Sequence, residues 1–221
     1  MSYRWDFTPV LAGAPLLVEG LVNTLKVTGV SLTCGLAIGL ALALMRLSRH
    51  RLMSWPAGFV IEVFRTTPPL VQLFWFFFAL PLIVGIEMTP FLAACVTFSI
   101  QSAAFFAEVF RAGIQSIERG QWDGARAIGM NHAQAMRRIV LPQAIKRMIP
   151  ALMNQSIIQF KNTSLVSVLA VPDLVYQSQV AAHDSYRPLE TYTAVAVAYA
   201  AILIPLTILA RRGEKRLAVG E

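Results

Sequence analysis

The residues that most often perform catalysis are scattered in this sequence. Its three histidines, His50, His132 and His183, are far apart along the chain and suggest no metal cluster. Cys34 and Cys95 each lie inside an apolar run without metal-ligand spacing, so we interpret both as small hydrophobic residues. A phosphate-cradling loop needs G-x-x-x-x-G-K-[ST], and this pattern does not occur. The sequence therefore predicts no metal, no cofactor bound by this chain and no enzymatic activity of its own.

Side chains that could bind a polar solute are concentrated instead in one long segment, residues 148–172. The segment has the length of a membrane span, but it carries one charge, Lys161, and many hydrogen-bonding groups. These polar residues are Asn154, Gln155, Ser156, Gln159, Asn162, Thr163, Ser164 and Ser167. The segment is either a soluble amphipathic helix or a span that is buried among others and lines a wet path. Its length and flanks favour the buried span.

Lys161 has two interpretations. A lysine inside a span costs about 2.5–3.5 kcal/mol on insertion scales, and such residues usually face a cavity. It either pairs structurally with Glu62 or Glu108, or it attracts the carboxylate of a solute.

Other polar residues extend this candidate solute path. Gln155 and Gln159 lie one turn apart and share a helix face, while residues 162–164 add hydrogen-bonding groups where the helix is expected to unwind. Pro68-Pro69 should break or kink the apolar run around it. The complete candidate path consists of Arg65, Thr67, Gln72, Glu108, Gln155, Gln159, Lys161, Asn162, Thr163 and Ser164.

The elements that must position these residues are membrane helices. Of 221 residues, 56% are hydrophobic and 14% are charged, whereas soluble domains carry about 25% charged residues. A helix needs about 20 apolar residues to cross a bilayer core of ~30 Å. The sequence predicts an all-α membrane protein, one transmembrane domain over residues 1–221, with a short outer interfacial segment near residues 9–20. Its five spans are expected at about residues 22–46, 58–86, 88–110, 146–172 and 191–211.

Basic residues predict the orientation of these spans. They concentrate in the connections after the first and third spans and in the C-terminal tail, and the other side of the membrane would hold only Arg4 and Arg187. The basic residues on the first side are Arg46, Arg49, Arg51, Arg111, Arg119, Arg126, Arg137, Arg138, Lys146, Arg147, Arg211, Arg212, Lys215 and Arg216. The positive-inside rule then places the N-terminus outside and the C-terminus in the cytoplasm.

The tetrapeptide EVFR occurs twice, at residues 62–65 and 108–111, near the predicted cytoplasmic ends of two spans. In each copy the glutamate and the arginine are spaced i, i+3 and can pair on one helix face. Each pair is either an interfacial ion pair that lowers the cost of charge near lipid, or a gate or substrate contact.

The connection at residues 111–142 is the most informative part of the sequence. Apolar residues recur in it at helical spacing, and Gly129-Met130-Asn131 predicts a helix stop followed by a restart. The connection should therefore form two short helices, each with an apolar face too small for a core. Such a surface is a solvated loop, an anionic-lipid patch, a DNA-reading helix pair or a docking site for another protein. Its attachment to spans at both ends disfavours nucleic acid, and docking to a cytoplasmic protein accounts best for the exposed apolar faces.

The same loop resembles the signature loop of ATP-binding-cassette importer permeases. That pattern is Glu-Ala-Ala, three residues, Gly, nine residues, Ile-x-Leu-Pro. Here Asp123-Gly124-Ala125 is followed by Gly129 and then by Ile139-Val140-Leu141-Pro142. Asp replaces Glu, Gly replaces the first Ala, and the spacing is kept throughout. Four further stretches are similar to the polar amino-acid branch of these permeases, namely residues 21–28, 63–72, 107–121 and 160–174.

The resemblance implies a function and partners. It implies a permease subunit of the bacterial inner membrane that moves a polar amino acid into the cytoplasm. Two permease subunits, identical or paralogous, would form the pore within membrane lipid. A cytoplasmic ATPase dimer would bind ATP and Mg²⁺, and an extracytoplasmic solute-binding protein would deliver the solute. The alternative is an ion-coupled carrier or channel that needs no partner.

The resemblance also implies roles for the coupling-loop residues Asp123, Gly124, Ala125, Gly129, Ile139, Leu141 and Pro142. Asp123 either bonds to the ATPase or caps its own helix N-terminus. Gly129 permits the turn, and Pro142 fixes the entry angle of the fourth span. Ile139 and Leu141 are expected to pack against the spans.

Overall fold

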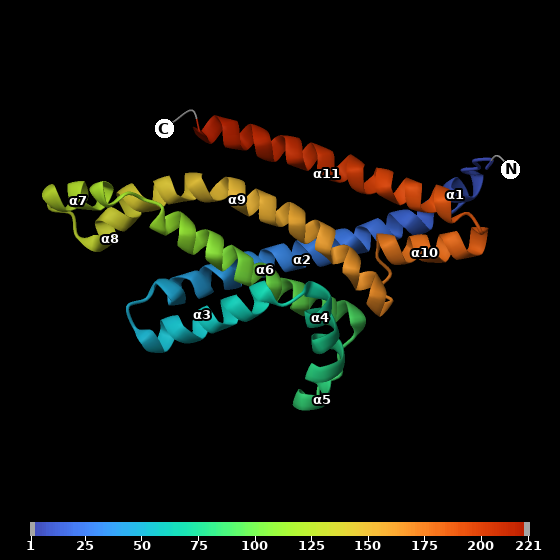
Figure 1. Cartoon of the computed structure of the whole chain (residues 1–221), viewed down its shortest axis with the longest axis horizontal. Coiled ribbons are helices and arrows are strands. Elements are labelled where there is room, and N and C mark those ends of the chain that lie inside the picture. The colour runs from blue at the N-terminus through green and yellow to red at the C-terminus, as the bar shows by residue number, and fades with distance from the viewer. Residues whose placement is uncertain (1–2, 219–221) are drawn as a thin grey trace. The chain divides into compact units, whose positions relative to one another are not determined.

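The computed structural model of this chain describes residues 3–218, and these residues form helices and connections without a strand. The first half contains α1 (Thr8–Ala12), α2 (Ala14–Leu47), α3 (Arg51–Thr66), α4 (Pro69–Phe74), the π-helical η1 (Trp75–Ala79), α5 (Leu80–Val84) and α6 (Pro90–Gln115). The second half contains α7 (Arg119–Ala127), α8 (His132–Ala135), the π-helical η2 (Met136–Val140), α9 (Leu141–Asn162), the 3-10 helix η3 (Thr163–Leu169), α10 (Leu174–Ser185) and α11 (Pro188–Ala218) (Figure 1). The predicted helical fold is confirmed. The first two and last three residues of the predicted 1–221 domain lie outside the described residues, and the single domain stays a prediction.

Within the described residues, three helices are long and apolar enough to cross a membrane. They are α2, α6 and the part of α11 from Pro188 to Gly213. Two further spans arise if Arg51–Thr66 is joined to Pro69–Val84, and His132–Leu169 to Leu174–Ser185. The described part of the chain therefore holds three to five candidate spans, and the predicted five is the upper value.

The helix that contains the predicted first span begins earlier than that span, whose beginning stays a prediction. We predicted a span from about residue 22 and a separate interfacial segment near residues 9–20. Instead α1 ends at Ala12, and α2 already begins at Ala14. Pro15 lies in the first turn of α2, where the missing proline N–H would have no partner in the helix anyway. The helix therefore continues through residues that we expected to lie apart from it.

The predicted break at Pro68-Pro69 is confirmed. α3 ends at Thr66, and α4 begins at Pro69. Pro68 has φ −59° and ψ 138°, the extended conformation that a residue before proline prefers. The predicted span 58–86 is therefore assembled from separate helices.

The fourth predicted span differs from a single regular helix at both ends. α9 begins at Leu141 rather than near residue 146, because α8 and η2 lead into it without a gap. It ends at Asn162, where we expected unwinding, and the chain tightens into the 3-10 helix η3. The candidate polar residues 162–164 thus lie at a change of helix type.

The chain divides into two compact units that are described separately. The first consists of Met1–Thr33, Thr67–Ser99 and Ile157–Leu206, and the second of Cys34–Thr66, Ile100–Ser156 and Thr207–Glu221. The core of the first unit contains Val27, Leu73, Ala94, Cys95, Phe98, Val166, Leu169 and Val171. Cys95 is thus a buried apolar residue, as predicted.

In the second unit, small residues let α2 and α6 approach closely. A Cβ on Gly35 would lie 2.5 Å from the Cβ of Ser102, so a larger residue would force the helices apart. Small residues at helix contacts are typical of membrane proteins, because they allow close backbone packing. This second unit holds the 111–142 loop, and the first holds the turn at residues 159–164.

Candidate functional site

The first half of the 111–142 loop is a short helix that ends at a glycine. Gly129 has φ +79°, a conformation that favours glycine because it has no Cβ. The Met130 N–H donates to the Ala125 carbonyl at 3.0 Å, and the Gly129 N–H donates to the Arg126 carbonyl at 2.9 Å. These two bonds form a Schellman motif. The predicted stop at Gly129 is confirmed.

The chain restarts at Asn131, also as predicted. The Gln134 N–H donates to Asn131 Oδ1 at 2.9 Å, and the Asn131 N–H donates to Gln134 Oε1 at 3.0 Å. This reciprocal capping box satisfies two backbone donors at the start of α8.

The second short helix does not stand alone, which corrects our prediction. α8 continues through η2 directly into α9. Pro142 lies in the first turn of α9, and a proline ring clashes with the carbonyl four residues earlier in a regular helix. The wider π-helical turn at residues 136–140 relieves this clash, so the helix passes the proline.

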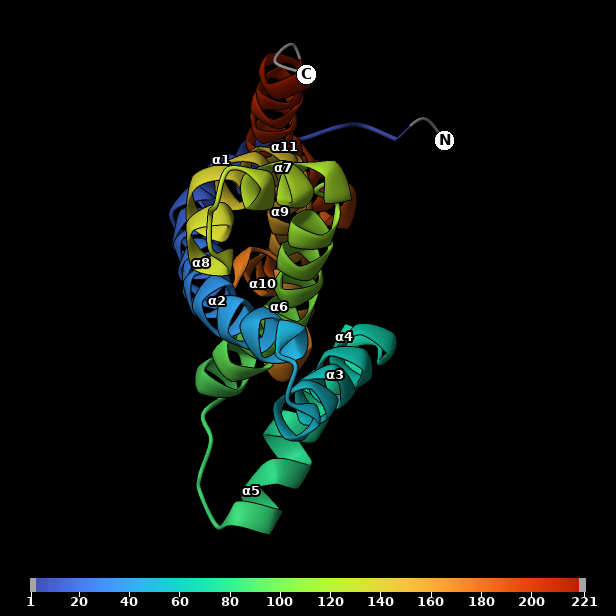
Figure 2. The ribbon, with the colours of Figure 1, turned by 90° about the vertical axis from the view of Figure 1, so that its left-hand side faces the viewer.

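The two arms of the loop are braced by contacts that we did not predict. The rings of Trp122 and His132 stack with centroids 4.9 Å apart and an interplanar angle of 13°. Gln143 Nε2 donates to Gln121 Oε1 at 3.2 Å. In Figures 1 and 2, α7 and α8 lie beside each other next to the end of α6 and the start of α9. The aromatic types of Trp122 and His132 were visible in the sequence, but their proximity depends on the angle of the turn.

A small apolar cluster supports the loop from within. It contains Ile117, Val140, Ala144 and Met148, with Trp122 and Met136 packed against it. We predicted that Ile139 and Leu141 would pack against the spans. The structure buries Val140 completely, while Leu141 is 38% exposed. Ile139 is partly buried, and the packing of Ile139 and Leu141 against the spans stays a prediction.

The outer surface of the loop is cationic and hollowed. A hollow of about 520 Å³ is lined by Arg49, Arg119, Trp122, Asp123, Arg126 and His132. Asp123 is paired with Arg126 at 3.4 Å, and both side chains are exposed. Asp123 lies inside α7, whose N-cap position is Glu118, so the alternative that Asp123 caps its own helix is wrong. Ile128 is 71% exposed between the two arms, which leaves an apolar side chain and several charges available to another molecule.

Both EVFR stretches form the predicted ion pair, but with different geometry. Arg65 Nη1 is 3.9 Å from Glu62 Oε2 in an exposed pair. Arg111 holds Glu108 with two groups: its Nε donates to Oε2 at 2.8 Å, and its Nη2 donates to Oε1. The guanidinium of Arg65 lies 5.9 Å from the ring centroid of Phe105. The bidentate pair of Arg111 with Glu108 is the stronger of the two. Arg65 is bound more weakly to its glutamate.

The polar turn at residues 159–164 satisfies its hydroxyls locally. Thr163 Oγ1 donates to the Phe160 carbonyl at 2.7 Å and lies 3.2 Å from Thr28 Oγ1. Ser164 Oγ donates to the Lys161 carbonyl at 2.7 Å. Hydroxyls that bond back to the preceding turn compete with regular helical bonds, which agrees with the change to a 3-10 helix at Thr163.

Two amide side chains of the candidate path, those of Gln159 and Gln72, are buried in the first unit. Gln159 is 0% exposed, and its Nε2 donates to the Phe98 carbonyl at 3.5 Å. Its Oε1 has no donor among the described residues. Gln72 Nε2 donates to the Thr67 carbonyl at 2.9 Å. A buried acceptor without a donor is unfavourable, so Gln159 Oε1 is placed to accept a further hydrogen bond.

Lys161 is exposed within the first unit. None of the ion pairs found among the described residues involves it. Its suggested partners, Glu62 and Glu108, belong to the second unit, so that pairing stays a prediction. Gln155, the remaining path residue, also belongs to the second unit and is partly buried.

The family follows from comparison of the whole sequence. Residues 35–219 match the family described as binding-protein-dependent transport system inner membrane component. This chain belongs to that family. The matched range contains the 111–142 loop and the polar turn at residues 159–164, and the predicted resemblance to importer permeases is confirmed.

Relatives of this family member cover nearly its whole length. It is 35% identical to the arginine transport system permease protein ArtQ of Bacillus subtilis over 96% of this chain and 97% of that protein. It is 37% identical to the glutamine transport system permease protein GlnP of Escherichia coli K12 over 98% of this chain and 99% of that protein. A crystal structure of an amino acid ABC transporter with histidines contains a chain that is 37% identical. It superposes with a TM-score of 0.91 over 97% of this chain and 100% of that one. The chain is thus a transport component with an ABC permease fold.

Proposed function

We propose that this chain is the membrane-spanning subunit of an ATP-driven importer, which moves a polar amino acid into the cytoplasm of a bacterial cell. The observation that carries the proposal is the braced surface of α7 and α8, where Ile128 and several arginines stay exposed. The relatives named for arginine and glutamine transport support an amino acid as the solute.

The proposed orientation places this surface in the cytoplasm and the N-terminus outside, in the bacterial inner membrane. A cytoplasmic ATPase dimer would receive residues 119–142, with Asp123 available to its side chains because that carboxylate is exposed. ATP and Mg²⁺ would be bound by the ATPase. A second permease subunit, identical or paralogous, would complete the pore, and an outer solute-binding protein would deliver the solute.

The continuity of helices supports a route for the proposed mechanical coupling. α8, η2 and α9 form one helical segment from His132 to Asn162, and α6 ends at Gln115, shortly before α7 begins. When the ATPase closes, a movement of the docked loop is passed along α9 to the polar turn and along α6 on its other side. Only a partner that binds two conformations with different affinity shifts their balance, and nucleotide-dependent closure of the ATPase supplies that difference.

The solute path would use the polar residues that we identified in the sequence. Lys161 would attract the carboxylate of the amino acid, and Gln159 would accept a hydrogen bond from its ammonium group. The remaining path residues are Arg65, Thr67, Gln72, Glu108, Gln155, Asn162, Thr163 and Ser164.

Transport in reconstituted vesicles tests the energy source. We expect uptake to require ATP, the ATPase and a soluble binding protein. Uptake by this chain alone, driven by an ion gradient, would exclude the proposal in favour of an ion-coupled carrier or channel.

Ile128→Asp tests the docking surface without disturbing the fold. We expect the ATPase to stop copurifying with this variant, because a carboxylate replaces the apolar side chain at the proposed contact. Leu52→Asp is the matched control, since Leu52 is 91% exposed and lies on α3. Unchanged copurification of both variants contradicts docking at α7 and α8.

A further inference from the structure

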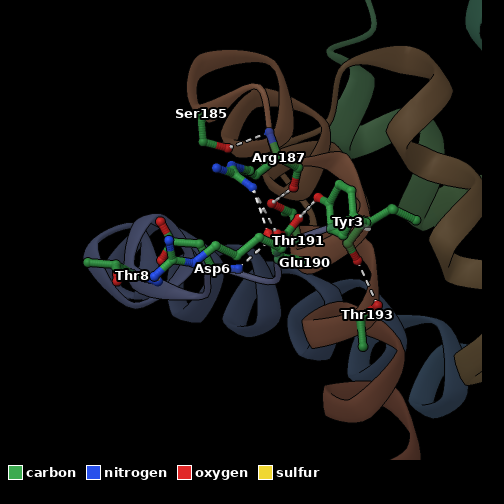
Figure 3. A network of polar contacts seen from close by, with 10 residues as sticks. Tyr3, Asp6, Thr8, Ser185, Arg187, Glu190, Thr191 and Thr193 are labelled. Carbon is green, nitrogen blue, oxygen red and sulfur yellow. Dashed lines mark hydrogen bonds and ion pairs between the residues drawn. The ribbon is translucent and has the colours of Figure 1, made fainter. Parts of the chain in front are cut away.

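The first residues of the chain are fastened to the start of α11. Tyr3 Oη donates to Glu190 Oε2 at 2.6 Å, and the Asp6 N–H donates to Glu190 Oε1 at 3.0 Å. Arg187 Nη1 donates to the Arg4 carbonyl at 3.1 Å and to Glu190 Oε1 at 3.4 Å. Figure 3 shows Tyr3, Asp6 and Arg187 converging on Glu190. The segment before α1 is therefore held at defined points.

Glu190 is the centre of this network. Its side chain is 0% exposed, and it lies in the first turn of α11, where a negative charge is favourable. Its hydrogen bond to the phenol raises the pKa of Tyr3, so that Tyr3 remains a donor. Two of the network's bonds reach main-chain groups of residues 4 and 6, and they fix the path of the segment as well as its side chains.

The fastened segment presents aromatic rings outward. Tyr3, Trp5 and Phe7 alternate along it and are 49%, 53% and 41% exposed. Their ring centroids are 5.6 Å apart for Tyr3 and Trp5, and 5.7 Å apart for Trp5 and Phe7. At the start of α11, Tyr186 and Tyr192 are also exposed. Five exposed aromatic rings thus come from two segments that Glu190 joins.

An apolar surface continues from these rings along the first helices. Leu11 on α1 is exposed, and so are Val18, Val22 and Leu25 on α2, whose i, i+4, i+7 spacing places these three on one face of that helix. Glu19 and Lys26 lie at the edge of that face, three residues before and four residues after Val22. The exposed apolar residues of α1 and α2 thus follow the aromatic segment along the chain, with Glu19 and Lys26 beside them.

We propose that Tyr3, Trp5, Phe7, Tyr186 and Tyr192 form an aromatic anchor in the phospholipid head-group layer, positioned by Glu190. Tyrosine and tryptophan are enriched at membrane–water interfaces because their rings are apolar at one end and polar at the other. α11 begins its candidate span at Pro188, so residues bonded to Glu190 lie near the membrane boundary. Arg4 and Arg187 flank the rings and can reach lipid phosphates. The choice of outer leaflet rests on the proposed orientation, but the contact with lipid does not.

Fluorescence quenching of Trp5 tests the anchor. The full-length chain would carry Trp55→Phe, Trp75→Phe and Trp122→Phe, so that Trp5 is the remaining tryptophan. It would be reconstituted in phosphatidylcholine–phosphatidylglycerol vesicles with bromine near the head group or near the acyl-chain end. We expect strong quenching by the shallow bromine and weak quenching by the deep one. Quenching by aqueous iodide without any by brominated lipid overturns the proposal. The proposal is also overturned if Trp5 is protected from iodide only after a solute-binding protein is added. That result would identify a protein-docking surface instead.

Variants of the network test the role of Glu190. Glu190→Ala should raise the detached fraction of the segment about tenfold or more, because it removes an ionised acceptor, and lipid quenching of Trp5 should fall. Tyr3→Phe keeps the ring and the buried carboxylate, so it gives a smaller loss and serves if Glu190→Ala fails to fold. Asp184→Asn is the control, since it removes an exposed charge from nearby α10. If quenching of Trp5 by shallow bromine is unchanged in Tyr3→Phe and in folded Glu190→Ala, Glu190 does not position the anchor. This outcome is independent of the transport assay.

Discussion

The 111–142 loop and the polar turn at residues 159–164 both interrupt a regular helix, but they use polar groups in opposite ways. In the loop, the Schellman motif at Gly129 and the capping box at Asn131 satisfy the backbone, and charged side chains stay exposed. In the polar turn, the hydroxyls of Thr163 and Ser164 bond to backbone carbonyls themselves. The first arrangement leaves side chains free to bind another protein. The second satisfies these two hydroxyls within the chain itself.

Gly129→Pro should have the largest effect, because it removes the feature on which the loop depends. Proline fixes φ near −65°, whereas Gly129 has φ +79° and donates its N–H to Arg126. We expect ATP-dependent uptake to be abolished while membrane insertion remains normal, as measured by vesicle transport and by size-exclusion chromatography in detergent. The milder Gly129→Ala should cost about 1–2 kcal/mol. Normal uptake by Gly129→Pro would show that the turn geometry is dispensable.

Lys161→Ala should separate function from stability in the polar turn. Substitution of an exposed side chain usually changes stability by less than about 0.5 kcal/mol, and Lys161 is exposed within its unit. Uptake should fall on the order of tenfold, since one charge-assisted hydrogen bond to the solute is lost. Thermal unfolding in detergent and initial uptake rates provide the two measurements. Equal losses of both would instead favour a structural ion pair.

A comparison of Thr163→Val with Ser164→Ala tests whether the buried hydroxyl contributes more to the free energy of unfolding than its neighbour does. Thr163 is 0% exposed and contacts Thr28 Oγ1, so its loss should cost about 1 kcal/mol and leave that partner less satisfied. Ser164 is only partly buried, and its loss should cost less than about 0.5 kcal/mol. The measurement is the free energy of unfolding in a denaturant series. Similar values for the two variants would remove the distinction between buried and peripheral hydroxyls.

Gly124→Ala should have the smallest effect, and it should stabilise the protein where the other variants destabilise it or reduce uptake. Gly124 lies inside α7, and no atom of the described residues lies within 4 Å of an added Cβ. Alanine should stabilise this helix by about 1 kcal/mol at most, with uptake unchanged or improved. Hydrogen exchange of the α7 amides is the measurement, and Gly120→Ala at the start of the same helix is the control. Faster exchange in Gly124→Ala would indicate that α7 needs flexibility at this position.

Local sequence was sufficient for the features that arise within a few residues. The stop at Gly129, the restart at Asn131 and the break at Pro68-Pro69 were all predicted and are confirmed. Each depends on a backbone conformation or a cap that neighbouring residues set. The pairing of Glu108 with Arg111 belongs to the same class, because i, i+3 neighbours share a helix face.

Other features required the tertiary structure. The complete burial of Val140 depends on its place in a π-helical turn, and the stack of Trp122 on His132 depends on the angle between two helices. The bond between Tyr3 and Glu190 joins residues 187 positions apart. The sequence by itself determined apolar spans, turns and caps, since these follow from the chemistry of adjacent residues. Only folding decided which distant side chains meet, because small changes in helix length and register rotate whole faces toward or away from each other.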